Sequence, residues 1–211
     1  MPAPSDLLAF IGATVVLLLI PGPAVIYMVN RTLSDGRGVG LASVAGLEVG
    51  DTIQALLAAL GLSAVIATSQ QLFDTIKWAG VAYLVWTGVR TLMTPPQAFS
   101  SDASHVTRGH AFRQGILVNS LNPKTALFFL SIFPQFVDPA AGNATLQSLV
   151  LAVVFVVLAT VFNTSYVLMA ARLRSLLLRG RALHIMRRWV SGVLFVALGA
   201  MAATAGRPSA N

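Results

Sequence analysis

The sequence predicts an all-α integral membrane protein with six transmembrane helices, arranged as two inverted three-helix repeats whose first and fourth helices are broken. The chain of 211 residues is 56% hydrophobic and 10% charged, with a mean hydropathy of +0.78, whereas soluble domains have about 25% charged residues. Its apolar runs come near the roughly 20 residues that cross a bilayer. Two of these runs contain proline-rich breaks. The runs lie at about 7–30, 39–67, 76–93, 114–137, 146–170 and 189–206.

The composition indicates one membrane unit without a cofactor. No polar stretch is long enough for a separate soluble domain, so we expect a single transmembrane domain over residues 1–211. The absence of cysteine excludes disulfides, iron–sulfur clusters and thiol relays. The three histidines fall in predicted loops and form no set of metal ligands, so no metal is expected. The N-terminal residues lack the positive region of a signal peptide, which indicates that the first apolar run is a retained span.

Most of the basic residues lie in the loops after the first, third and fifth spans. The positive-inside rule therefore places these loops in the cytoplasm and both termini on the outer, periplasmic side. This placement explains the net charge of +7 better than nucleic-acid binding does. Segment 94–112 is expected to be a cytoplasmic linker between the repeat halves 1–103 and 104–211. The arginines concerned are Arg31, Arg37, Arg90, Arg108, Arg113, Arg172, Arg174, Arg179, Arg181, Arg187 and Arg188.

Two short motifs start a helix inside a span. They are Pro21-Gly22-Pro23 and Asn122-Pro123-Lys124. Asn122 is a good N-cap and Pro123 suits the first helical position, and Gly22 with Pro23 makes a weaker version of the same start. The prolines also deprive the carbonyls of Leu17, Leu19 and Asn119 of their helical donors. Such carbonyls are costly in hydrocarbon, so broken helices survive only where protein or a polar cavity surrounds them.

Three pairs of motifs recur in the same order in the two halves. Gly22-Pro23 corresponds to Asn122-Pro123, Asp51-Thr52 to Asn163-Thr164, and Lys77-Trp78 to Arg188-Trp189. Three spans per half force the halves into opposite orientations, which is the inverted-repeat architecture. Paired breaks at corresponding places are typical of the midplane binding site of a secondary transporter. Small residues are expected to permit close helix contacts, namely Gly46, Gly50, Gly80 and Gly88.

Three ionisable residues lie well inside the predicted spans: Glu48, Asp51 and Lys124. Each costs a few kcal/mol at mid-bilayer on insertion scales, so we expect them to face one another or water. Glu48 and Asp51 are three residues apart and share a helix face, and Lys124 has a similar depth. A buried ion pair that only locks helices is the alternative. Further polar residues could complete a cavity or bond to freed carbonyls, namely Asn119, Ser120, Asn163 and Gln54.

A cavity with both charge signs suits a small zwitterion. The N-termini of two half-helices, together with Lys124, favour a carboxylate. Asp51, with or without Glu48, favours an ammonium group or a transported proton. An amino acid or amino-acid derivative, protons and the lipid bilayer are therefore the expected partners, and a homo-oligomer is compatible with the sequence.

Motifs along nearly the whole chain resemble one known family. They are Pro-Gly-Pro in the first span, Gly46 through Gly50-Asp51 in the second, the Gly80, Tyr83, Leu84 and Gly88 pattern in the third, and Asn-Ser-Leu-Asn-Pro-Lys through Phe-Pro-Gln-Phe-Val-Asp-Pro over 119–139. This combination resembles the lysine-exporter (LysE/RhtB-type) superfamily. The resemblance implies an exporter of amino acids or derivatives in the bacterial cytoplasmic (inner) membrane, driven by the proton motive force. It carries site roles to Pro21, Gly22, Pro23, Asp51, Asn122, Pro123 and Lys124.

Glu48 departs from the pattern of that superfamily, in which the position is usually small and uncharged. The additional carboxylate leaves two alternatives open, a cationic substrate or a change in proton coupling. A membrane-embedded enzyme is the main rival class, but no histidine or cysteine lies in the spans to serve as a base or nucleophile. A channel-like subunit that uses the buried charges is a second alternative.

Overall fold

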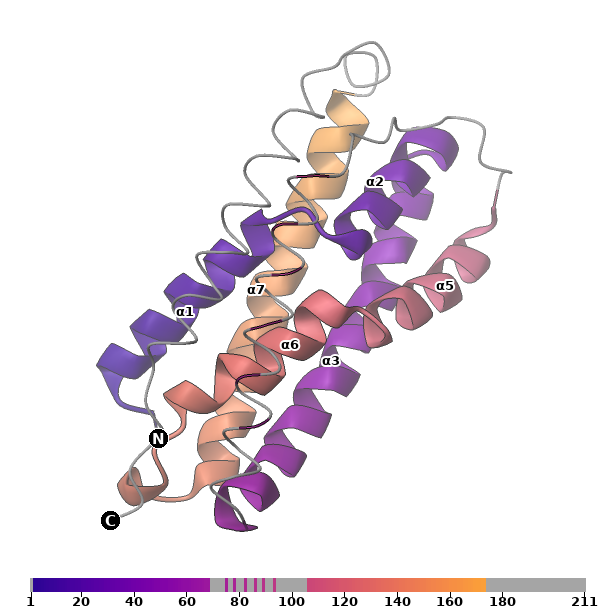
Figure 1. Cartoon of the computed structure of the whole chain (residues 1–211). Helices are drawn as coiled ribbons and strands as arrows, with labels where there is room; N and C mark the ends of the chain where they lie inside the picture. Colours follow the sequence, from indigo (N-terminus) through magenta and orange to yellow (C-terminus); the bar gives the residue numbers. More distant parts are fainter. Residues whose placement is uncertain are drawn as a thin grey trace.

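The computed structural model describes residues 2–68 and 106–173, together with positions 75, 78, 82, 86, 89 and 93 (Figure 1). The regular elements of this part of the chain are all helical. The predicted spans at 76–93 and 189–206 lie outside the two continuous ranges. The α-helices are α1 (Pro4–Leu19), α2 (Pro23–Asp35), α3 (Arg37–Thr68), α5 (Arg108–Ser120), α6 (Pro123–Ser131) and α7 (Ala144–Arg172), and the 3-10 helices are η1 (Phe133–Phe136) and η2 (Pro139–Ala141).

Two of the described helices are long and apolar enough to cross a membrane alone, α3 over Arg37–Gly61 and α7 over Ala144–Arg172. Two further candidate spans are bent pairs of helices, which meet the same criteria when each pair is taken together. The axes of α1 and α2 differ by 51°, and α5 and the segment Pro123–Phe136 differ by 41°. The predicted breaks in the first and fourth spans are therefore confirmed. The inverted relationship of the two halves remains a prediction, because the third helix of each expected half lies outside the described ranges.

The local sequence explains both breaks. At the first, Pro21 and Pro23 have no N–H to continue the helix, and the Ile20 N–H turns back to the Leu17 carbonyl at 3.1 Å. At the second, the side chain of Asn122 accepts a hydrogen bond from the Lys124 N–H at 3.2 Å, so Asn122 is the N-cap of α6. The glycine start of α2 has no such side-chain cap.

Helix α5 begins inside the segment that was predicted to be a linker. Segment 94–112 is expected to be a linker, and its last residues, from Arg108 on, form the first turns of α5. The reason is a local cap, because the Thr107 side chain accepts a hydrogen bond from the His110 N–H at 3.3 Å. His110 is therefore an exposed helical residue rather than a loop residue.

Helices α3 and α5 pack so closely that glycine is required between them. A Cβ atom at Gly46 would overlap the carbonyl of Phe112, and a Cβ atom at Gly50 would lie 2.8 Å from the Cβ of Asn119. The expected close contacts of Gly46 and Gly50 are thus confirmed, whereas Gly80 and Gly88 lie outside the described residues. Gly115 on α5 makes the reciprocal contact, 2.6 Å from the Ser43 carbonyl, and the sequence analysis did not identify it.

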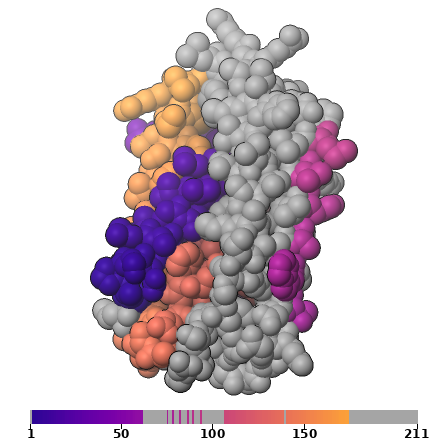
Figure 2. All heavy atoms as spheres, turned by 60° about the vertical axis from the view of Figure 1, so that its left-hand side comes forward, coloured from indigo at the N-terminus to yellow at the C-terminus, as the bar shows by residue number. Residues whose placement is uncertain are grey.

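Phenylalanines fill the core between α1, the α6–η1 segment and α7. The ring of Phe155 on α7 lies 4.7 Å from that of Phe129 and 5.5 Å from that of Phe128. Phe10 on α1 contacts Phe128 at 5.9 Å and Phe133 at 5.7 Å. On the face shown in Figure 2, α1 lies between α7 and the α6–η1 segment. This aromatic core fixes the two half-helices α1 and α6 to α7.

Candidate functional site

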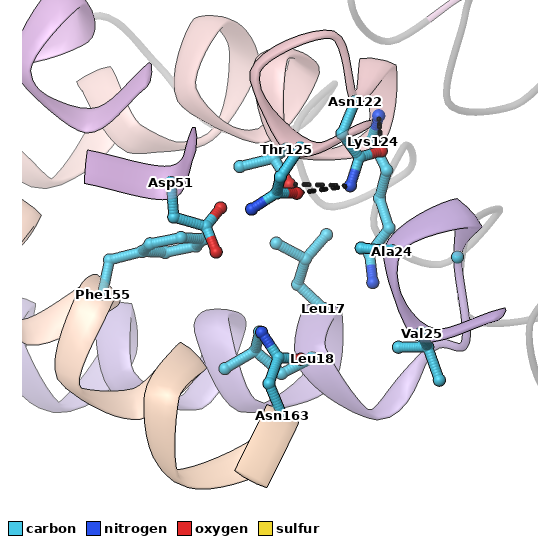
Figure 3. Close-up of a pocket in the computed structure, with 12 residues that line it drawn as sticks. Leu17, Leu18, Ala24, Val25, Asp51, Asn122, Lys124, Thr125, Phe155 and Asn163 are labelled. Atoms are coloured by element: carbon cyan, nitrogen blue, oxygen red, sulfur yellow. Dashed lines mark hydrogen bonds between the residues drawn. The ribbon is translucent and has the colours of Figure 1, made fainter. Parts of the chain in front are cut away.

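A pocket lies where the two broken spans meet α3 and α7 (Figure 3). Each of the six described α-helices contributes to its wall, so the pocket depends on the whole bundle rather than on one motif. Polar groups come from α3, α5, α6 and α7, and apolar groups come mainly from α1, α2 and α7. The lining residues are Leu17, Leu18, Gly22, Ala24, Val25, Asp51, Asn119, Asn122, Lys124, Thr125, Phe155 and Asn163.

Lys124 joins the two breaks. It stands in the first turn of α6, and its Nζ donates a hydrogen bond to the carbonyl oxygen of Ile20 at 2.6 Å. Ile20 is the C-terminal cap of α1, so the ammonium meets the negative end of that helix dipole. Gly22 leaves room for this side chain, because a Cβ atom there would lie 2.9 Å from the Cδ of Lys124. Lys124 itself is buried, with 7% of its surface exposed.

Asp51 faces the same pocket from α3. It is 3% exposed and lies across the pocket from Lys124 in Figure 3, with the Leu17 side chain between them in this view. The two charged groups do not form a direct ion pair, since the ion pair found within 4.0 Å among the described residues is Arg31–Asp35. The alternative of a simple ion-pair lock therefore does not describe this arrangement.

The asparagines at the second break serve mainly to hold it. Asn122 donates from Nδ2 to the Asn119 Oδ1 at 3.1 Å and to the Thr125 hydroxyl at 3.2 Å. Asn119 donates to the Leu47 carbonyl of α3 at 2.7 Å. Gln54 lies outside the pocket, and its Nε2 contacts the carbonyls of Asn119, Ser120 and Asn122 at 2.7, 2.9 and 3.4 Å. Gln54 thus satisfies carbonyls that the break sets free, which was one of the two expectations for it.

Glu48 does not line the pocket, although Asn163 does. The Nδ2 of Asn163 donates to Glu48 Oε1 at 2.8 Å, and the hydroxyl of Thr160 lies 3.1 Å from Glu48 Oε2. Both partners are on α7, so the second carboxylate is held between α3 and α7 rather than against Lys124. Asp51 and Lys124 both line the pocket, as the first part of that expectation has it, whereas the half-buried Glu48 contacts α7 and does not line the pocket.

The remaining predicted site residues shape the backbone. Pro21, Pro23 and Pro123 stand at the breaks and are not among the residues that line the pocket. The apolar wall and Thr125 were not predicted as site residues, because leucine, valine and phenylalanine in a span carry no signal that distinguishes a pocket wall from a lipid-facing surface. Thr160 could have been identified as an isolated polar residue in an apolar run. No group of three potential metal-ligating side chains occurs in the part of the chain that the structure describes.

Comparison with known proteins decides the family. The family model described as LysE type translocator matches residues 15–206. This chain belongs to the LysE type translocator family. As a LysE-type translocator it is a multi-pass membrane protein and not an enzyme, which confirms the resemblance drawn from the motifs.

Named relatives cover almost the full LysE-type chain. A homoserine/homoserine lactone efflux protein from Salmonella typhimurium is 31% identical over 93% of this chain and 95% of its own. A leucine efflux protein from Klebsiella pneumoniae is 26% identical over 93% of this chain and 94% of its own. An uncharacterized membrane protein from Vibrio cholerae is 32% identical over 94% of this chain and 96% of its own. No solved structure matches the chain.

Proposed function

We propose that this LysE-type translocator is a secondary-active exporter of amino acids or amino-acid derivatives, driven by the proton motive force. The observation that carries the proposal is the placement of Asp51 and Lys124 around one pocket without a direct ion pair. Two buried charges of opposite sign that do not neutralise each other suit a ligand that carries both signs. The names of the relatives, efflux proteins for homoserine and its lactone and for leucine, support the same class of substrate.

We propose that the carboxylate of the substrate binds at the Lys124 side. Helix α6 begins at Pro123 and helix α2 begins at Pro23. The N-terminus of each helix carries the positive end of a helix dipole and lies near the pocket. The ammonium of Lys124 would exchange the Ile20 carbonyl for the stronger, charged acceptor of the substrate. Asp51 would receive the substrate ammonium from α3, and the apolar wall would contact the aliphatic part of the substrate.

Coupling to protons follows from competition at a carboxylate. A proton that enters from outside and binds Asp51 or Glu48 removes negative charge from the acidic side of the site, which weakens binding of the substrate ammonium and favours release outward. We further propose that the breaks formed by Pro21, Gly22, Pro23, Asn122 and Pro123 let the two halves move around the pocket in alternation. Asn119 and Asn163 would position the polar wall. The expected location is the bacterial cytoplasmic membrane, with both termini outside.

Flux measurements in proteoliposomes test this function. Purified protein is reconstituted, the vesicles are loaded with radiolabelled homoserine, leucine or a wider panel of amino acids, and efflux is followed with and without an imposed pH gradient. We expect a gradient to accelerate efflux of at least one zwitterionic substrate and an uncoupler to abolish the acceleration. A channel-like subunit would instead give flux that is independent of the gradient. Flux of that kind, or none across the panel, would overturn the proposal.

A further inference from the structure

Glu48 is an intramembrane carboxylate that the pocket does not use. It lies on α3, one helical turn before Asp51, and is half-buried against α7. Of the charged groups in the neighbouring pocket, Lys124 makes no ion pair with Glu48, and Asp51 is a second carboxylate of the same charge that interacts with it unfavourably. Helix α7 has no charged residue before Arg172, and Arg31 on α2 is paired with Asp35. Among the described residues, the direct hydrogen-bond partners of the Glu48 side chain are therefore the neutral Asn163 and Thr160.

The hydroxyl of Thr160 has two neighbours that both accept hydrogen bonds. Its Oγ1 lies 3.1 Å from Glu48 Oε2 and 2.8 Å from the carbonyl oxygen of Val156 on its own helix. A hydroxyl has one proton to donate and lone pairs to accept with. It can therefore donate to only one of these two oxygens at a time.

Two complete hydrogen-bond arrangements result. When Glu48 is ionised, the Thr160 hydroxyl donates to Oε2 while Asn163 donates to Oε1. When Glu48 is protonated at Oε2, its new O–H donates to Thr160 Oγ1, and the threonine proton rotates to the Val156 carbonyl. Asn163 donates to Oε1 in both arrangements. The carboxyl group thus keeps both hydrogen bonds whether or not it carries the proton.

We propose that Glu48, held by Asn163 and Thr160, is a proton-binding site of the transport cycle, separate from the Asp51 carboxylate that receives the substrate ammonium. This proposal rests on the proposed function. The step is a simple protonation, in which a proton from the water on one side forms an O–H bond with the carboxylate and the same bond breaks on release to the other side. Asn163 both lines the pocket and donates to Glu48, so it connects the occupied pocket with the protonation of Glu48.

The first test separates proton coupling from substrate movement. Glu48→Gln keeps the size of the side chain and mimics its protonated form. In proteoliposomes, we expect this variant to lose the acceleration of efflux by a pH gradient, while exchange of labelled for unlabelled substrate at equal pH is reduced far less. The wild type is measured first in both assays. A wild type without gradient-driven flux would refute the proposed function, whereas a Glu48→Gln variant that responds to the gradient like the wild type would refute only the role of Glu48.

The second test examines the hydroxyl. Thr160→Val removes it, and the ionised carboxylate then loses a charge-assisted hydrogen bond while the acid loses a weaker one. We expect the midpoint of the pH profile of gradient-driven efflux to move to higher pH by about 0.5–1 unit, and Thr160→Ser to restore it. Thr52→Val is the matched control, because within the described part of the chain the Thr52 hydroxyl bonds to the main-chain carbonyl of Glu48 and not to its carboxylate. Equal profiles for Thr160→Val and Thr52→Val would contradict the proposal.

A direct measurement remains decisive if Glu48→Gln does not fold. Infrared difference spectra of the wild type on acidification should contain the C=O band of a newly protonated carboxyl group. We expect that band to shift in Thr160→Val, where the acid has lost its acceptor, and to stay in place in Thr52→Val. A band at the same position in all three proteins would overturn the assignment.

Discussion

The ammonium of Lys124 donates to the carbonyl oxygen of Ile20 at 2.6 Å, across 104 residues of sequence. The first turn of one broken helix therefore caps the end of the other. Distant side chains also contact other carbonyls at the breaks. Tyr166 of α7 contacts the carbonyls of Leu18 and Leu19 at 3.3 and 3.2 Å. Each break thus survives in the membrane because a separate helix supplies its missing donors.

Replacement of Lys124 tests this capping and the substrate site together. Lys124→Met should abolish export and lower the free energy of unfolding by about 1–3 kcal/mol, since the Ile20 carbonyl loses a charged donor. Thermal unfolding in detergent and vesicle flux measure the two effects. The double variant Lys124→Met with Asp51→Asn should fold and remain inactive. Full transport by the double variant would mean that the two charges only balance each other and take no part in transport.

Gly22 should be sensitive because of the room it leaves for Lys124. In Gly22→Ala, the new Cβ would lie 2.9 Å from the Cδ of Lys124, so the flexible side chain must shift away from the Ile20 carbonyl. We expect flux to fall severalfold with little change in expression, and Gly22→Val to be worse. Gly12→Ala on α1 is the matched control, since no atom lies within 4 Å of its Cβ. It should be neutral or slightly stabilising, by about 0.5–1 kcal/mol. Equal loss of flux in Gly12→Ala and Gly22→Ala would show that displacement of the Lys124 side chain is not the cause.

Gln54 should matter more for stability than for recognition. Gln54→Leu keeps the approximate volume but removes the donor that contacts three carbonyls of the second break. We expect a loss of about 1–3 kcal/mol in unfolding free energy, measured by thermal or denaturant unfolding in detergent. Substrate affinity of the protein that remains folded should change little, because Gln54 does not line the pocket. A large loss of affinity without a loss of stability would contradict this role.

Topology can be tested on a clean background, because the chain contains no cysteine. Two exposed positions near opposite ends of the described bundle are suitable, Gly109 at the start of α5 and Ala141 in η2. Ala141→Cys should react with an impermeant thiol reagent added to intact cells. Gly109→Cys should react only after the membrane is opened. The reverse pattern would overturn the orientation inferred from the arginines.

Local chemistry explains why some features could be predicted from the sequence. Pro21 and Pro23 break a helix wherever they occur, because the missing N–H and the ring clash act within one turn. Asn122 caps α6 through a bond to Lys124 two residues away. Intramembrane charges are likewise visible without a structure. The glycine contacts of Gly46 and Gly50 could be anticipated as close packing, but not which helix would approach them.

The amino-acid sequence is enough to predict the membrane class, the breaks in the first and fourth spans, and the buried charges, Asp51 in the second span and Lys124 in the fourth. How those charges are used depends on the packing of the helices. It directs Lys124 to Ile20 rather than to Asp51, and it pairs Glu48 with Asn163 and Thr160 on α7. The physical reason is that hydrogen-bond partners in a helical bundle are set by helix packing. Residues more than 100 positions apart meet only after α3, α6 and α7 have packed, whereas caps and breaks depend on neighbours within one turn of the chain.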